Sequence, residues 1–156
     1  MDMHSWDDMT RGVGCPFCGE RAGADEYKIE IAKLGVSTLY LKRDQAYPGF
    51  CLLIYDRRHV NGVEDLESDE HPAVMADLYR AARAIRAAVR PDQMNYASLG
   101  NGIPHLHWHI IPRFKSERKW GRAHWTTEPG DPARVRRYLG DEEYRELVDR
   151  IRLHLK

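Results

Sequence analysis

Three histidines alternate with hydrophobic residues in the segment HLHWHII, which runs from His105 to Ile111. Successive side chains of a β-strand point to opposite faces, so His105, His107 and His109 would share one face and the intervening residues the other. Helical spacing would spread the same imidazoles around a cylinder. The segment therefore predicts a strand with an open row of imidazoles, which we interpret as part of a functional site rather than as a histidine-rich surface strand.

A second signal lies near the N-terminus, where Cys15-Pro16-Phe17-Cys18 forms a C-x-x-C knuckle typical of zinc sites. The third cysteine, Cys51, lies in a hydrophobic run and is expected to pack in the core. Cys15 and Cys18 are therefore interpreted as metal ligands rather than as a disulfide.

Composition limits the class of protein. A chain of 156 residues with 42% hydrophobic content suits one domain with a real core. No hydrophobic run approaches the length of a membrane span, and the polar N-terminus lacks a signal-peptide layout, so a cytoplasmic location is expected. The net charge of zero argues against a general nucleic-acid binder.

The hydrophobic pattern predicts an α+β fold, an antiparallel meander with one long helix and C-terminal helices. Strands are expected over 27–32, 36–41, 50–55, 94–99 and 105–114. The long helix is expected from an N-cap at Ser68 to Pro91, with Val74, Leu78, Ala81, Ile85 and Val89 on its inner face. A short helix from Asp131 to Gly140 and an amphipathic helix from Asp141 to Leu155 complete the chain.

These motifs together resemble the histidine-triad (HIT) family, in particular its zinc-containing bacterial branch. The His105–Ile111 segment resembles the family motif His-φ-His-φ-His-φ-φ, where φ is hydrophobic, and Arg57-Arg58-His59-Val60 resembles a second family segment. The resemblance covers residues 13–114, and we expect 1–156 to form a single HIT-like domain with 115–156 as a C-terminal extension.

Two metal sites compete on paper. His59 follows one predicted strand and His105 opens another, so both can join Cys15 and Cys18 at one end of the sheet, a set that the resemblance also implies. Four protein ligands would fill the coordination shell of a structural zinc ion. The alternative uses His105, His107 and His109 together, although alternate strand residues are about 6.8 Å apart and the outermost pair is twice as far.

If Cys15, Cys18, His59 and His105 bind the metal, as we favour, His107 and His109 remain available for catalysis. A neutral imidazole is a good nucleophile toward phosphorus when one ring nitrogen is held as N–H. The resemblance implies that His107 attacks the α-phosphorus of a nucleotide to form a covalent nucleotidyl-histidine, and that His109 contacts phosphate oxygens or the leaving group. No serine or cysteine lies in a nucleophile-elbow context, and no P-loop is present.

The residues that contact the substrate in the HIT family are only partly matched in this sequence. Asn101 corresponds to a family amide that contacts ribose or phosphate, or else is a turn residue, and Asp44 is the best match to the family's ribose-binding position. Gly102-Ile103-Pro104 replaces the longer glycine-rich loop that contacts the leaving group in many members.

A basic stretch follows the triad and surrounds Trp120; its members are Arg113, Lys115, Arg118, Lys119 and Arg122. It is either a solvated loop or a binding region for the phosphates of a charged leaving group, which we expect to be preferred over a phosphoramidate. Trp120 and Trp125 either cap the active site or, as we favour, pack against the last helix.

The leading hypothesis is a nucleotide hydrolase or nucleotidyl transferase that acts on a nucleotide or dinucleotide. The alternatives are a non-catalytic nucleotide-binding regulator and a metal-dependent hydrolase that uses the triad as ligands. The resemblance also implies a homodimer formed by the long helix and a strand, with small residues Ala82 and Ala88 allowing close approach.

Overall fold

A computed structural model describes residues 5–18, 25–126 and 136–156 of the chain. Its helices are α1 (Trp6–Thr10), α2 (Glu70–Val89) and α3 (Asp141–Leu153), with a 3₁₀ turn, η1, at Val63–Asp65. Its strands are β1 (Lys28–Lys33), β2 (Ser37–Lys42), β3 (Cys51–Tyr55), β4 (Gln93–Ala97) and β5 (His107–Arg113). Among these described helices, none combines the length and hydrophobicity that crossing a bilayer requires.

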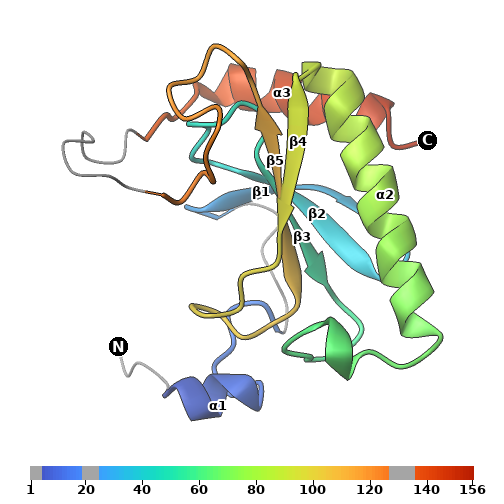
Figure 1. The fold of residues 1–156 in the computed structure, drawn as a ribbon. Helices are drawn as coiled ribbons and strands as arrows, with labels where there is room; N and C mark the ends of the chain where they lie inside the picture. Colours follow the sequence, from blue (N-terminus) through green and yellow to red (C-terminus); the bar gives the residue numbers. More distant parts are fainter. Residues whose placement is uncertain (1–4, 19–24, 127–135) are drawn as a thin grey trace.

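The strands form one antiparallel sheet in the order β1-β2-β3-β5-β4 (Figure 1). The first three strands follow one another as a meander. Helix α2 then carries the chain across the sheet, so β4 becomes an edge strand and β5 returns between β4 and β3. The α+β class predicted from the hydrophobic pattern is confirmed.

Helices α2 and α3 pack on one face of this sheet. The core contains the α2 residues Leu78, Ala81 and Ile85 together with Leu53 of β3 and Ile110 of β5. Cys51 is fully buried in the same core, and burial raises the pKa of its thiol, as expected for a packing residue. Because side chains alternate along β5, the neighbours of Ile110 turn to the face that these helices leave open.

Strand β5 is shorter than predicted. It begins at His107, not at His105, and β4 ends at Ala97 rather than at Leu99. The backbone N–H of His105 donates to Ile103 O at 2.8 Å, while the N–H of Leu106 donates to Val60 O at 2.7 Å. These bonds turn the chain before the ladder with β3 begins, so His105 is not in register with the other two histidines.

The start of α2 also differs from the prediction. Ser68 is not its N-cap, because the helix begins at Glu70 and the backbone N–H groups of Glu70 and His71 donate to Glu67 O. Backbone bonds thus satisfy donors that a serine hydroxyl was expected to satisfy. Ala88 packs in the core and is not available to a partner chain.

The predicted helix from Asp131 to Gly140 falls partly outside the described residues, since 131–135 are not among them. Residues 136–140 are not helical, and Gly140 precedes α3 as its N-cap residue. Helix α3 itself confirms the predicted amphipathic helix, with Tyr144, Leu147 and Ile151 buried.

Candidate active site and metal centre

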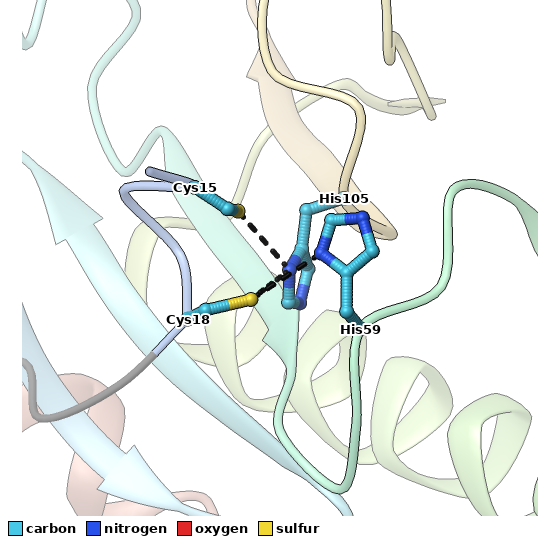
Figure 2. A group of neighbouring side chains, drawn as sticks. All are labelled: Cys15, Cys18, His59 and His105. Atoms are coloured by element: carbon cyan, nitrogen blue, oxygen red, sulfur yellow. Dashed lines mark hydrogen bonds between the residues drawn. The ribbon is translucent and has the colours of Figure 1, made fainter. Parts of the chain in front are cut away.

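Four potential metal ligands meet at one end of the sheet (Figure 2). Cys15 and Cys18 lie on the segment that follows α1, His59 lies on the loop after β3, and His105 lies just before β5. Cys15 and His105 are buried, and the other two are half-buried. The fold therefore brings together the four residues that the sequence predicted as one ligand set.

The spacing of these atoms suits tetrahedral zinc. Cys15 Sγ lies 3.5 Å from His105 Nδ1, and Cys18 Sγ lies 3.3 Å from His59 Nδ1 and 3.5 Å from His105 Nδ1. All four ligand atoms lie within 4.8 Å of one another. In a tetrahedral zinc site, with ordinary bond lengths, a sulfur and a nitrogen ligand are about 3.6 Å apart. The donor set and its geometry both fit the metal.

The outer nitrogens of both histidines are held by carbonyl groups. His105 Nε2 lies 2.8 Å from Tyr55 O, and His59 Nε2 lies 3.2 Å from both Thr10 O and Asn61 Oδ1. A carbonyl oxygen only accepts, so each Nε2 carries the proton and each Nδ1 turns its lone pair toward the cysteines. Such outer hydrogen bonds orient metal-binding imidazoles.

The loop that carries His59 is fastened to the start of α2. The Glu70 carboxylate accepts hydrogen bonds from Arg58 Nη2 at 2.6 Å, from the Tyr55 hydroxyl at 2.7 Å and from the backbone N–H of Glu67 at 2.9 Å. Mainly through the Arg58 bond, this environment lowers the pKa of Glu70 to about 2. The ionised carboxylate therefore holds the residue next to His59 in place.

His107 and His109 lie side by side on the open face of β5. Their Nε2 atoms are 3.1 Å apart, and their ring centroids are 5.1 Å apart. His107 Nδ1 lies 2.6 Å from His105 O, so the protonated Nδ1 donates a hydrogen bond to that carbonyl and Nε2 carries the lone pair. The Nε2–H group of His109 then donates a hydrogen bond to His107 Nε2. The pair thus offers one nucleophilic nitrogen and one hydrogen-bond donor at the same point.

Burial favours the neutral form of His107. The imidazole is only 5% exposed, and desolvation lowers its pKa below 6.5 despite the bond to the His105 carbonyl. The ring of Phe17 packs edge-on against it, with centroids 5.1 Å apart, and also against His105. The spacing of the knuckle does not by itself predict this contact of Phe17.

The three histidines do not form one metal site. His105 turns to the cysteines, whereas His107 and His109 face each other, and the ligand cluster found within the described ranges is the one that contains both cysteines. The set His105, His107 and His109 is therefore wrong as a joint ligand set, because the bend before β5 separates its first member from the other two.

The contacts described for Asp44 and Asn101 are with parts of the chain other than the imidazole pair. Asp44 Oδ1 accepts the backbone N–H groups of Ala46 at 3.1 Å and Arg137 at 3.2 Å, which ties the β2–β3 loop to the segment before α3. Asn101 is exposed and lines a cavity of about 500 Å³ with Trp6 and Trp108. Trp108 alternates with His107 along β5, so it belongs to the opposite face.

The basic stretch after β5 is partly structural. Arg113 is buried and donates to Glu117 Oε1, Asn95 Oδ1 and Lys119 O, while Lys119 Nζ donates to Thr126 O at 2.7 Å. These two cations hold their own loop together, which is neither of the two alternatives that the sequence offered, a solvated loop or a binding region for phosphates. Arg118 and Arg122 are exposed, and for them the choice between those two alternatives stays untested.

The same loop places a fourth histidine, His124, beside His109 on the open face of the sheet. The ring centroid of His124 lies 6.1 Å from that of His109 and 4.9 Å from that of Trp125. Trp125 is 54% exposed, so it does not pack against the last helix as favoured from the sequence. His124 was missed because it lies 15 residues beyond His109, with no periodic pattern between them.

The chain is similar to several known proteins. A model of the HIT domain matches residues 26–116. The bis(5'-adenosyl)-triphosphatase of Saccharomyces cerevisiae is 34% identical over 73 residues, which cover 44% of this chain. The chain spans only about a third, 35%, of the length of that relative.

Solved structures agree with the fold. A histidine triad protein from Bradyrhizobium japonicum has a TM-score of 0.76 and 25% identity, covering 89% of this chain and 98% of the other. A zinc-bound histidine triad family protein from Mycobacterium smegmatis has a TM-score of 0.53 and 24% identity, covering 81% and 82%. Together with the family match, these likenesses lead to one conclusion: the chain belongs to the HIT domain family.

Proposed function

We propose that this protein is a nucleotide hydrolase or nucleotidyl transferase that acts at an α-phosphate through a covalent intermediate on His107. The observation that carries the proposal is the 2.6 Å bond from His107 Nδ1 to His105 O, which leaves the Nε2 lone pair 3.1 Å from His109 Nε2. The lowered pKa of His107 supports it, because a neutral imidazole is the nucleophilic form.

The reaction has two steps. His107 Nε2 attacks the α-phosphorus, a P–N bond forms, and the bond from phosphorus to the leaving group breaks with its electron pair going to the leaving atom. The His105 carbonyl stabilises the positive imidazole that results, and His109 donates a hydrogen bond to a phosphate oxygen. Water or another acceptor then forms a bond to phosphorus, the P–N bond breaks with its electron pair returning to His107 Nε2, and the proton of the acceptor passes to solvent.

The relatives suggest the class of substrate. The yeast protein that matches part of the chain is named a bis(5'-adenosyl)-triphosphatase, so a dinucleoside polyphosphate is the first substrate to test. Such a molecule presents an α-phosphate whose leaving group is itself a nucleotide. The predicted contacts of Asn101 and Asp44 with ribose or phosphate stay predictions, and neither residue is needed for the two steps above.

Zinc belongs to the proposal as a structural ion. Cys15, Cys18, His59 and His105 would hold it with four protein ligands, which stabilises the fold around the knuckle and supplies no open coordination position for a reacting group. The name of the Mycobacterium smegmatis relative, which states that it is zinc-bound, supports the same metal. All chemistry in the proposed reaction therefore falls to the protein's own side chains.

The wider organisation is also proposed. We expect residues 1–156 to act as one HIT-like domain, which the packing of α3 against α2 and β1 supports. We expect a homodimer in the cytoplasm. Strand β4 lies at the end of the order of described strands and its Tyr96 is exposed, which supports a partner along that edge.

The decisive experiment is to trap the intermediate. The protein is mixed with diadenosine triphosphate, quenched in alkali within one turnover, and analysed by intact-mass and peptide mass spectrometry. We expect one adenylyl group on the peptide that contains His107, and none in His107→Ala. Nucleotide binding without any adduct or turnover would instead identify a non-catalytic nucleotide-binding regulator.

A further inference from the structure

The ring of Phe50 is a meeting point for three nitrogen-bearing side chains. Phe50 is 1% exposed and lies just before β3. The centroid of its ring lies 5.6 Å from that of His109 and 5.5 Å from that of His124, and Lys42 Nζ lies 4.5 Å from the same ring. These groups come from β2, β5 and the loop after β5, so only the tertiary fold brings them together.

The position of His124 is built by several bonds rather than left to a loose loop. The buried Arg113 holds the first half of the loop through Glu117 Oε1 and Lys119 O. Lys119 Nζ holds the second half through Thr126 O, and Tyr47 OH donates to His124 O at 3.4 Å. The ring of His124 also packs edge-on against Tyr47.

The chemistry of this group favours an anion. Lys42 brings a positive charge, the imidazoles bring N–H donors, and the buried Phe50 ring offers no acceptor for a ligand hydroxyl. The carboxylate of Asp44, which the sequence analysis matched to a ribose-binding position, accepts hydrogen bonds from the backbone N–H groups of Ala46 and Arg137. Lys42, His109 and His124 are all half-buried, so a ligand can reach them. Phosphate binds most strongly to donors of this kind.

We propose that Lys42 and His124, placed around Phe50, form a subsite for a second phosphate group of the substrate, beside the α-phosphate that His107 attacks. This inference rests on the proposed function and sharpens it, because it predicts that good substrates carry a phosphate beyond the reacting one. Lys42 and His124 donate hydrogen bonds to that phosphate. When it belongs to the leaving group, they stabilise the charge that appears on the departing oxygen as the P–O bond breaks.

The second phosphate has two conceivable sources, the leaving group or the ribose, and three substrates distinguish them. The first is diadenosine triphosphate, whose leaving group is ADP. The second is the p-nitrophenyl ester of AMP, which has only the reacting phosphate. The third is the same ester with an added ribose 2'-phosphate. Steady-state kcat/KM is measured for wild type, Lys42→Gln and His124→Asn. Arg86→Gln is the control, because it neutralises an exposed arginine of α2, on the other side of the sheet.

We expect Lys42→Gln and His124→Asn each to lower kcat/KM for a substrate with a second phosphate by about 10- to 100-fold, as for the loss of a charge-assisted hydrogen bond. The plain ester should change less than about threefold in both variants, and Arg86→Gln should leave all three substrates unchanged. Loss with the triphosphate alone identifies the leaving group as the source, and loss with the 2'-phosphate ester alone identifies the ribose.

Equal effects on all three substrates, or no effect on any, would overturn the subsite. Calorimetric binding of the same compounds to His107→Ala, with and without Lys42→Gln, gives a second readout that needs no turnover. A wild-type protein that forms no adduct would refute the proposed function alone. A binding preference for the second phosphate, lost in Lys42→Gln, would still support the subsite, and its absence would refute it.

Discussion

The ring of Phe17 packs edge-on against the imidazole of His107, with centroids 5.1 Å apart, although 90 residues separate the two in the chain. Phe17 lies between the two cysteines of the knuckle, so the metal centre and the proposed nucleophile share this contact. We therefore expect a metal ion held by the four ligands to influence the proposed reaction through packing, by fixing the Phe17 ring that His107 contacts.

Phe17→Ala should lower kcat about 10-fold, because an imidazole with free space on one side spends less time in the attacking orientation. Zinc content should stay that of wild type, since no ligand changes. Phe17→Leu, which keeps most of the volume, should recover much of the rate. Both quantities come from steady-state kinetics and elemental analysis. Loss of zinc in Phe17→Ala would assign the defect to the metal centre instead.

His107→Ala should abolish turnover while nucleotide binding stays close to wild type, because the nucleophile stabilises the transition state much more than the bound substrate. His109→Ala should reduce the rate less, since it removes one hydrogen-bond donor. Single-turnover kinetics and calorimetric binding measure the two effects. A tenfold loss of rate corresponds to an activation free energy raised by about 1.4 kcal/mol. If His107→Ala retains more than about a tenth of the activity, covalent catalysis by this residue is ruled out.

The purified protein should contain about one zinc ion per chain. Cys15→Ser should lose both metal and stability, because binding a structural metal contributes directly to the free energy of folding. Cys51→Ser offers a matched control, since Cys51 lies in the core away from the four ligands and should leave the zinc content unchanged. Elemental analysis without zinc, in protein purified without chelators, would contradict the assignment.

Glu70 should make stability depend on acid pH. Its pKa falls from an ordinary 4.5 to about 2 on folding, so its contribution is fully present above pH 4.5 and disappears as the pH falls through 2. Glu70→Gln should therefore lower the free energy of unfolding at pH 7, with a gap from wild type that narrows between pH 4.5 and 2. Denaturant titrations across this range measure the gap. A gap that is independent of pH would show that the ionised carboxylate is not responsible.

The protein should sediment as a dimer at micromolar concentration, with about twice the 18.1 kDa mass of one chain. Tyr96→Glu places a charge at the exposed edge strand β4 and should shift the protein toward the monomer. Trp6→Glu changes another exposed aromatic residue, on α1 rather than on the edge strand, and should not. A wild-type mass near that of a single chain would be evidence against the homodimer.

Local pattern was sufficient for the five strands, for helices α2 and α3, and for most of the candidate site. The alternation around His107 and His109 defines a strand with one hydrophobic face, because the side-chain period of a strand is two whatever the surrounding fold. Knuckle chemistry identified Cys15 and Cys18 as ligands, since paired thiolates at that spacing suit zinc. The periodicity of Leu78, Ala81 and Ile85 likewise predicted the inner face of α2.

Tertiary structure decided what no local pattern encodes. The bend that takes His105 out of the strand depends on a bond from Leu106 to Val60, and α2 starts after Ser68 because of a bond to Glu67. Both partners are backbone groups, which the side-chain pattern does not reveal. The meeting of Lys42, Phe50 and His124 depends on how Arg113 folds the loop after β5. Long-range contacts of this kind arise from packing, so the sequence determined which chemical groups are available and the fold determined which of them meet.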